Sequence, residues 1–405
     1  MGIRGEAGTR GSTVRSDCWV AVDIRDHGEL EICLSSKVEG MYGARIRSRL
    51  LEGCQVLGVD HGRVEVEDMG ALEWVLDARL ECAVRRARPD TPAEFLPPGS
   101  GLAHAATPRD RLRRSRLYLP GNQPKLMLNA GLHGPDGVIL DLEDAVAPAE
   151  KDSARVLVRN ALRRVDFHGA ERMVRINQGP RGLEDLPWII PHHVHVVLVP
   201  KVENPAQVIA VAEGIAEIDH LHDVWIMPII ESALGAWKAY EIATAHPSVV
   251  ALAVGLEDYT ADIGVPRTLE GRESFWARSQ IVNAAIAAGV QPIDTVFSDV
   301  ADEAGLRSSV AEAKALGFVG KGCIHPRQIG PVHEAFAPGV AEISRARDIV
   351  LAFEDAEKRG LGVVALGSKM IDAPVVKRAL TTIRTAIGVG LLADDWRDTH
   401  QEIPE

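Results

Sequence analysis

Short runs of apolar residues alternate with amphipathic stretches through the central part of the chain. A short apolar run is typical of a strand buried on both faces, and an apolar repeat of 3.6 residues is typical of a helix. The expected strands are 115–119, 138–140, 173–176, 194–199, 224–230, 249–254, 292–297 and 318–324. The expected helices are 125–130, 150–165, 205–218, 233–245, 275–288 and 302–316. This alternation predicts a (β/α)8 barrel, whereas a doubly wound open sheet, the alternative, usually stops at about five to seven strands.

The sequence on either side of this region has a different character. Residues 1–87 predict a small two-layer α+β domain, with strands at 17–24, 30–34 and 63–66 and helices at 41–55 and 71–87. Residues 88–112 are rich in proline and predict a semi-extended linker that lets this domain move relative to the barrel at 113–330. Residues 331–405 predict a helical C-terminal tail, with helices at 332–336, 339–360 and 373–387 and the turn G-S-K-M-I-D-A-P at 367–374.

Composition excludes several classes of protein. The 405-residue chain carries a net charge of −12, which argues against a nucleic-acid binder. No apolar run approaches membrane-spanning length, and the N-terminus lacks the apolar core of a secretion signal. The five cysteines form no C-x-x-C pair, so we expect a cytoplasmic protein without disulfides or a zinc site.

Polar residues follow the expected strands at the points where the strands end. The clearest case is G-V-I-L-D-L-E-D-A-V-A-P at 137–148, where Asp141, Glu143 and Asp144 follow an apolar run. Carboxylates this close repel one another and need a cation, an arginine or water, so an acidic loop that pairs with a neighbour would also explain them. The other strand ends contribute P-G-N-Q-P-K at 120–125, Arg175, Asn177, Lys201, Glu203, Glu231, Ser232, Glu257, Asp258, Ser298, Asp299 and His325.

The carboxyl ends of barrel strands meet on one face, so we expect these side chains to converge there. Several carboxylates with one arginine and one lysine suit a divalent cation and an anionic substrate. Oxygen ligands without a Cys/His cluster favour Mg2+ or Mn2+ over zinc. The residues therefore predict a metal-assisted enzyme that acts on a small carboxylic acid, the alternative being that several carboxylates simply pair with Arg or Lys at the barrel rim.

The motifs taken together resemble the citrate lyase β-subunit family, HpcH/HpaI-type aldolases and acyl-thioester carbon–carbon lyases with a TIM barrel. The resemblance covers essentially all of 113–387, in order. It rests on R-R-S-R-L-Y-L-P-G-N (113–122), V-I-L-D-L-E-D-A-V-A-P (138–148), V-R-I-N (174–177), V-P-K-V-E (199–203), P-I-I-E-S (228–232), G-L-E-D (255–258), I-D-T-V (293–296), C-I-H-P (323–326) and K-M-I-D-A-P-V-V (369–376).

This resemblance implies roles for particular residues. Glu231 and Asp258 match the metal ligands of the family, and Arg175 matches an arginine that faces the thioester oxygen. Asp372 matches an acid that the C-terminal segment supplies as a lid, often from a neighbouring subunit, although from the residues alone it is a helix N-cap before Ala373-Pro374. Asp141 and Glu143 then have a supporting catalytic role, in which they bind water on the metal or fix Arg175.

The N-terminal domain resembles the citrate lyase γ subunit, an acyl carrier protein. The resemblance rests on A-G-T at 7–9, Ser16-Asp17 and G-A-L-E-W-V-L-D-A-R-L-E at 70–81. It implies that Ser16, or in reserve Ser12, carries a phosphoribosyl-dephospho-CoA prosthetic group. The family usually places one small residue between the serine and the aspartate, which this chain lacks, and an ordinary serine at a strand start is the alternative.

The function implied is Mg-dependent cleavage of a citryl thioester to oxaloacetate and an acetyl thioester. Two alternatives are a malyl-CoA or citramalyl-CoA lyase that acts on free CoA thioesters, and a non-catalytic carrier or scaffold subunit of a lyase complex. The expected partners are a small acyl thioester, a citrate lyase α (transferase) subunit and further copies of the chain in a trimer or hexamer, with no nucleic acid and no membrane. A short linker would raise the effective concentration of the tethered thioester at the barrel.

Overall fold

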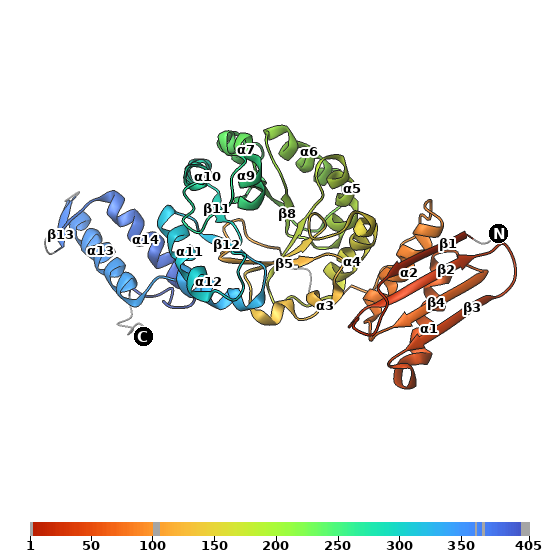
Figure 1. Ribbon diagram of the computed structural model, residues 1–405. Helices are drawn as coiled ribbons and strands as arrows, with labels where there is room; N and C mark the ends of the chain where they lie inside the picture. The colour runs from red at the N-terminus through yellow and green to blue at the C-terminus, as the bar shows by residue number, and fades with distance from the viewer. Residues whose placement is uncertain (1–2, 100–105, 361–362, 367–368, 398–405) are drawn as a thin grey trace. The chain divides into compact units, whose positions relative to one another are not determined.

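The computed structural model describes residues 3–99, 106–360, 363–366 and 369–397 (Figure 1). Part of the predicted linker, at 100–105, and part of the predicted turn, at 367–368, lie outside these residues. Contacts divide the chain into a first unit, Met1–Asp302 with Ala313–Ile329, and a second unit, Glu303–Glu312 with Gly330–Glu405. Within the described residues, no helix combines the length and the apolar character that crossing a membrane requires.

The N-terminal domain is a four-stranded sheet covered by two helices. The sheet has the order β1-β2-β4-β3, with β3 parallel to β4 and the other pairs antiparallel. Alternate residues of β4 are buried, and its Val64 and Val66 pack with Leu50 and Leu80 of the helices. The elements are β1 (Ile3–Gly8), β2 (Cys18–Ile24), β3 (Leu30–Ser36), α1 (Glu39–Val56), β4 (Gly62–Asp68) and α2 (Glu73–Ala87). The predicted α+β layout is confirmed.

Strand β1 was not predicted, because its sequence I-R-G-E-A-G has little β-propensity. It forms because it pairs with β2 along its whole length and lies against helix α2. A Cβ at Gly5 would overlap the carbonyl oxygen of Ala83 in α2, so the glycine permits this close approach.

The central region is a closed barrel of eight parallel strands, which confirms the predicted (β/α)8 fold. Strand β12 pairs with β5 and closes the ring, which excludes the open sheet. The interior is filled by apolar side chains such as Ile139, Met173 and Met227. The strands are β5 (Ser115–Pro120), β6 (Gly137–Asp141), β7 (Glu171–Arg175), β8 (Val196–Val199), β9 (Trp225–Ile230), β10 (Ala251–Val254), β11 (Gln291–Asp294) and β12 (Gly320–Cys323).

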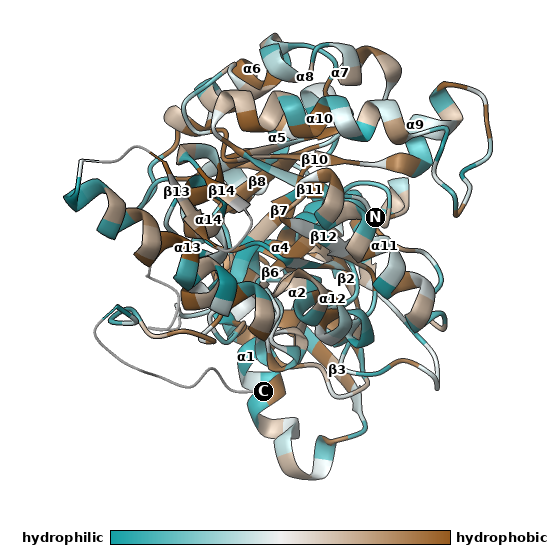
Figure 2. Cartoon of the chain, turned by 90° about the vertical axis from the view of Figure 1, so that its left-hand side faces the viewer, coloured by the Kyte–Doolittle hydropathy of each residue, from teal (hydrophilic) through white to brown (hydrophobic). Residues whose placement is uncertain are grey.

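Helices surround the barrel strands (Figure 1). In Figure 2, strand β10 is hydrophobic along its length, whereas helix α10 alternates between hydrophilic and hydrophobic residues. The helices are α3 (Pro124–Met127), α4 (Lys151–Arg164), α5 (Gly179–Ile189), α6 (Pro205–Ala216), α7 (Ala233–Trp237), α8 (Ala239–Ala243), α9 (Leu256–Asp262) and α10 (Phe275–Ala288). Helix α11 (Glu303–Leu316) begins in the second unit and ends in the first. Short 3-10 turns are η1 (Ala130–His133), η2 (Pro148–Glu150), η3 (Ile190–His192) and η4 (Pro326–Gln328).

Helices α5 and α9 were not predicted. Helix α5 carries Pro180 in its first turn, where proline is tolerated, but also Pro187 in its interior, which by itself argues against a helix. Its buried face, with Leu186 and Ile189, packs against α4 and α6. Tertiary packing therefore outweighs the local cost of the interior proline.

The second unit is built around two long helices. It contains α12 (Ile329–Phe336), α13 (Val340–Lys358), the hairpin of β13 (Val364–Leu366) and β14 (Lys369–Ile371), and α14 (Ala373–Gly388). Its own core includes Ile343 and Val350 of α13, Ile383 of α14, and Trp396. The carboxylate of Asp372 accepts a hydrogen bond from the Val375 N–H at 3.2 Å, so Asp372 is the N-cap of α14.

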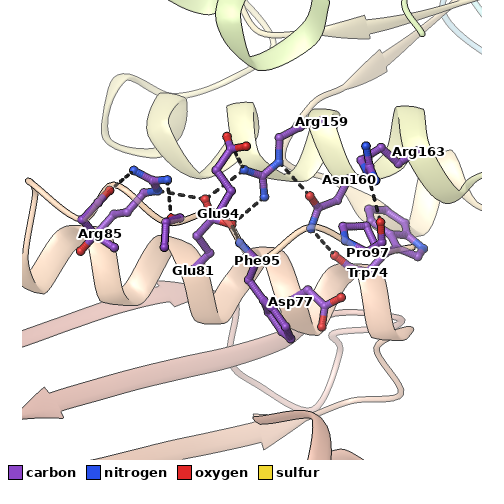
Figure 3. A network of polar contacts seen from close by, with 12 residues as sticks. Trp74, Asp77, Glu81, Arg85, Glu94, Phe95, Pro97, Arg159, Asn160 and Arg163 are labelled. Atoms are coloured by element: carbon purple, nitrogen blue, oxygen red, sulfur yellow. Dashed lines mark hydrogen bonds and ion pairs between the residues drawn. The ribbon is translucent and has the colours of Figure 1, made fainter. Parts of the chain in front are cut away.

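The N-terminal domain and the barrel are joined by a buried polar interface between α2 and α4 (Figure 3). Glu81 of α2 and Arg159 of α4 have fully buried side chains and form an ion pair at 2.6 Å. Beside it, the Asn160 amide donates to the Trp74 carbonyl at 3.1 Å, and the Arg163 guanidinium donates to the Pro97 carbonyl at 3.0 Å. The domain thus contacts the barrel through a helix face as well as through the linker.

Candidate functional site

Strands β6 and β7 present an arginine and a carboxylate as a matched pair. Their register places Asp141 directly beside Arg175. The guanidinium donates from Nε to one carboxylate oxygen at 2.7 Å and from Nη2 to the other at 2.6 Å. These carboxylate bonds outweigh burial, which alone would lower the pKa of Arg175, and raise that pKa above its usual value. Arg175 is therefore a fixed cation at the carboxyl end of the barrel.

Glu143 extends this pair into a cluster. Its side chain is buried and lies 3.0 Å from Nη1 of Arg175, and it accepts a hydrogen bond from the Gln178 amide at 2.7 Å. Burial raises the pKa of Glu143 although Arg175 opposes the shift. Asp141 and Glu143 thus hold Arg175 from two sides. Asp141 and Glu143 therefore pair with an arginine, as the alternative interpretation of the acidic loop expected.

Lys201 brings a second cation to the same cluster. Its ammonium lies 3.4 Å from Glu143, 3.5 Å from Asp144 and 3.3 Å from Asp258. Burial alone would lower the pKa of Lys201, but these three carboxylates together raise it. The backbone of Lys201 has a φ of 51°, a left-handed conformation that is rare for a residue with a side chain and is typical of functional sites.

Glu231 and Asp258, the expected metal ligands, lie on the same side of the barrel. Glu231 is buried at the end of β9, and one of its oxygens accepts the Lys201 N–H at 2.9 Å. Burial, together with repulsion from Asp258, raises the pKa of Glu231 to about 8. A Cβ at Gly255 would overlap the other oxygen of Glu231, so the glycine leaves space for this carboxylate.

Two repelling carboxylates with hard oxygen donors, one of them buried, fit a divalent cation that keeps most of its coordination positions for water and substrate. Across the residues that the structure describes, no three His, Cys, Asp or Glu side chains stand together as a ready-made metal site. Glu231 and Asp258 are therefore the pair that could hold such a cation, and a substrate would have to complete the coordination.

A cavity of about 420 Å3 joins these groups. Asp141, Arg175, Glu231 and Asp258 all line it, so four of the expected site residues share one space. Its further lining residues include Arg116, Tyr118, Thr295 and Gly322. Arg116 and Tyr118 were not predicted as site residues, because the motif R-S-R-L-Y-L indicates a buried strand and a family resemblance but no chemical role for either residue. The alternation of the strand, which puts residues 116 and 118 on one face, was the available signal.

Two other expected residues have local roles that the structure shows. Asp372 belongs to the second unit, where it caps α14. His325, at the end of β12, accepts a hydrogen bond from the Arg327 N–H at 3.2 Å and so caps η4.

Ser16 lies in the segment that joins β1 to β2, and its N–H donates to the Met69 carbonyl at 3.2 Å. It has a left-handed backbone with a φ of 55° and is partly exposed, whereas Ser12 is exposed. The next residue, Asp17, is buried and receives two hydrogen bonds from Arg79, at 3.0 and 2.8 Å. Arg79 also donates to Ser153 of α4 at 2.5 Å and to the carbonyl of Asn122 at 3.3 Å. Arg79 therefore links Asp17, the neighbour of Ser16, to the segment that follows β5.

The family described as HpcH/HpaI aldolase/citrate lyase matches residues 114–326, which are more than half of the chain. The chain belongs to this family. The carrier family described as malonate decarboxylase delta subunit matches residues 5–87, so the N-terminal domain of this lyase is of the acyl-carrier type. Both findings confirm the resemblance that the sequence motifs indicated.

Named relatives of this lyase differ in substrate. The citrate lyase subunit beta of Leuconostoc mesenteroides is 39% identical over 68% of this chain and 94% of that protein. The mitochondrial citramalyl-CoA lyase of Homo sapiens is 34% identical over 68% of this chain and 86% of that protein. A crystal structure of the Mycobacterium tuberculosis protein CitE with magnesium, acetoacetate and coenzyme A has 33% identity and a TM-score of 0.59, and covers 69% of this chain and 99% of that one.

Proposed function

We propose that the chain is a magnesium-dependent lyase that cleaves a citryl thioester carried on its own N-terminal domain, yielding oxaloacetate and an acetyl thioester. The observation that carries this proposal is the contact of an acyl-carrier domain with the barrel, where Arg79, the partner of Asp17 next to Ser16, donates to the Asn122 carbonyl in the loop that follows β5. A lyase for free CoA thioesters has no use for a carrier held in this position.

Glu231 and Asp258 are the proposed metal ligands, with Mg2+ or Mn2+ as the metal. When bound there, Mg2+ supplies a Lewis acid for the hydroxyl and carboxylate of the substrate. The Lys201 ammonium contacts the Asp258 carboxylate, and the Lys201 backbone N–H donates to the Glu231 carboxylate, so Lys201 orients both ligands. Asp141 and Glu143 support the site by fixing Arg175.

The cleavage is a retro-Claisen reaction. A water molecule takes the proton of the substrate hydroxyl, and the hydroxyl oxygen becomes the oxo group of oxaloacetate as the carbon–carbon bond breaks. The electron pair of the broken bond moves onto the thioester as an enolate. Arg175 is the proposed partner of the enolate oxygen, because two carboxylates hold its guanidinium in place and the residue lines the cavity. A preorganised cation costs no reorganisation as the charge develops.

The enolate carbon must then be protonated to give the acetyl thioester. Asp372 is the proposed acid, supplied by the C-terminal segment of the same or a neighbouring subunit as a lid over the site. Its position as an N-cap is compatible with this role, because the cap uses only one of the two carboxylate oxygens.

Ser16 is the proposed attachment site of a phosphoribosyl-dephospho-CoA arm, with Ser12 in reserve. Because the carrier domain is docked, the arm and not the domain would carry the acyl group to the cavity. We further propose that a citrate lyase α-type transferase loads citrate onto this arm and that the chain acts as a homo-oligomer.

A second candidate is a lyase for free malyl-CoA or citramalyl-CoA, and the citramalyl-CoA lyase among the relatives favours it. The same barrel residues would serve both reactions. The deciding experiment offers citryl, citramalyl and malyl thioesters, each on the carrier and on CoA, with and without Mg2+. We expect cleavage of carrier-bound citryl thioester, dependent on Mg2+. Faster turnover of a free CoA thioester than of the carrier-bound citryl group would overturn the proposal in favour of the second candidate.

A further inference from the structure

Arg116 lies deeper in the barrel than the strand-end residues of the site. In the pairing of β5 with β6, Arg116 is opposite Gly137, whereas Pro120, at the end of the strand, is opposite Asp141. Its side chain is on the inner face with Tyr118 and is 1% exposed. Arg116 nevertheless lines the same cavity as Arg175 and Glu231. A guanidinium therefore stands at the inner end of the substrate cavity.

The hydrogen bonds of this guanidinium are incomplete. Nη1 contacts the sulfur of Met227 at 3.2 Å, a weak acceptor, and Nη2 makes a long bond of 3.4 Å to the carbonyl of Asp294. Nε is buried without a partner among the described residues. The Asp294 carboxylate is already used by Lys321 at 2.7 Å and Arg278 at 3.2 Å. No carboxylate of the described chain therefore pairs with Arg116.

Other arginines buried to the same degree have the carboxylate partner that Arg116 lacks. Arg79, Arg113 and Arg159 each donate two hydrogen bonds to one carboxylate, those of Asp17, Glu171 and Glu81 respectively. A buried guanidinium remains protonated, and its fork of donors matches the two oxygens of a carboxylate. Burial of such a charge without a partner is costly, so an unsatisfied group of this kind in a native structure calls for a partner that the chain itself does not supply.

We infer that Arg116 is a specificity-determining residue that binds the second carboxylate of the fragment that leaves as a 2-oxo acid, the one that is not next to the oxo group. This inference rests on the proposed function. The oxo acid is oxaloacetate for a citryl thioester, pyruvate for a citramalyl thioester and glyoxylate for a malyl thioester, and of these three only oxaloacetate carries a second carboxylate. Arg116 thus selects substrates whose oxo-acid product is a dicarboxylate.

The test compares full-length wild type with Arg116→Met, which keeps the length of the side chain and removes its charge. A charge-assisted hydrogen bond is worth roughly 10- to 100-fold in binding. We expect the ratio of kcat/KM for citryl over citramalyl thioester to fall by about this factor, chiefly through KM. Arg116→Lys recovers part of the ratio. The control is Arg114→Met, which removes the charge of a nearby arginine that pairs with Asp136. This variant leaves the ratio unchanged.

A second measurement requires neither turnover nor a variant. Calorimetric titration of the wild-type chain in MgCl2 compares oxaloacetate with its 4-methyl ester, which lacks the charge that Arg116 would bind. We expect oxaloacetate to bind at least about tenfold more tightly. Equal affinities, or an unchanged kcat/KM ratio in a folded Arg116→Met protein, would overturn the inference. If wild type cleaves none of the thioesters, the proposed function fails, while the titration still decides the role of Arg116.

Discussion

The ion pair of Glu81 and Arg159 allows a quantitative prediction of how strongly the carrier domain is held on the barrel. Two hydrogen bonds, at 3.0 and 2.6 Å, join their fully buried side chains. Loss of one partner from a buried pair costs about 3–5 kcal/mol, because the other charge stays in the interior. In Arg159→Met, Glu81 keeps hydrogen bonds from Arg85 at 2.9 Å and from the Phe95 N–H at 2.8 Å. We therefore expect the lower value, about 3 kcal/mol.

Hydrogen–deuterium exchange of helix α2 measures this cost directly, because amide exchange reports the free energy of local opening. A loss of about 3 kcal/mol corresponds to exchange roughly 150-fold faster for the amides of 73–87. The control is Arg45→Met, which removes the exposed pair with Glu73 on the same helix and should change exchange less than about fivefold. The double variant Glu81→Met/Arg159→Met leaves no buried charge and should regain most of the protection. If Arg159→Met exchanges no faster than Arg45→Met, the pair does not hold the carrier domain on the barrel.

Three further predictions concern the lid, the metal and the pH dependence of stability. Asp372→Asn keeps a good N-cap and should keep the melting temperature while abolishing cleavage, and full activity would exclude Asp372 as the acid. Glu231→Gln and Asp258→Asn should each weaken Mg2+ binding at least about tenfold by calorimetry, whereas Glu257→Gln, the neighbouring exposed carboxylate, should not. Burial and nearby arginines lower the pKa of His192 to about 3. Because an unfolded histidine titrates near 6.5, its contribution to stability is present above that pH and is lost as the pH falls toward 3. His192→Gln should therefore lose about 2 kcal/mol less than wild type between pH 7 and pH 5 in urea melts, and equal losses would refute the assignment.

The pattern of apolar residues predicted the barrel because strands buried on both faces appear in a sequence as continuous apolar runs, as at Val138–Leu140. The same logic predicted that polar residues would converge at strand ends, and Asp141, Arg175, Glu231 and Asp258 do share one cavity. Helix α5 escaped prediction because its prolines oppose a helix locally while its packing favours one.

The docked interface could not be predicted, because helix α2 interleaves charged residues with its apolar residues. Asp77, Arg79 and Glu81 suggest a solvated face, yet all three are buried. Their partners lie on other segments, with Arg159 78 residues away from Glu81 and Asp17 62 residues from Arg79. A single sequence shows which residues are charged but not which distant residue forms an ion pair with each of them. The unpaired state of Arg116 is invisible for the same reason.

The central claim is that a carrier domain and a lyase barrel in one chain act on the same acyl group, and one measurement tests it most directly. The purified chain, with its prosthetic arm attached and loaded with citrate, is mixed with Mg2+, and oxaloacetate release and the intact mass of the protein are followed together. We predict one acetyl group left on the peptide that contains Ser16 for each oxaloacetate released, with both lost in Ser16→Ala and retained in Ser12→Ala. Oxaloacetate release that persists without any modification of the N-terminal domain would contradict the claim.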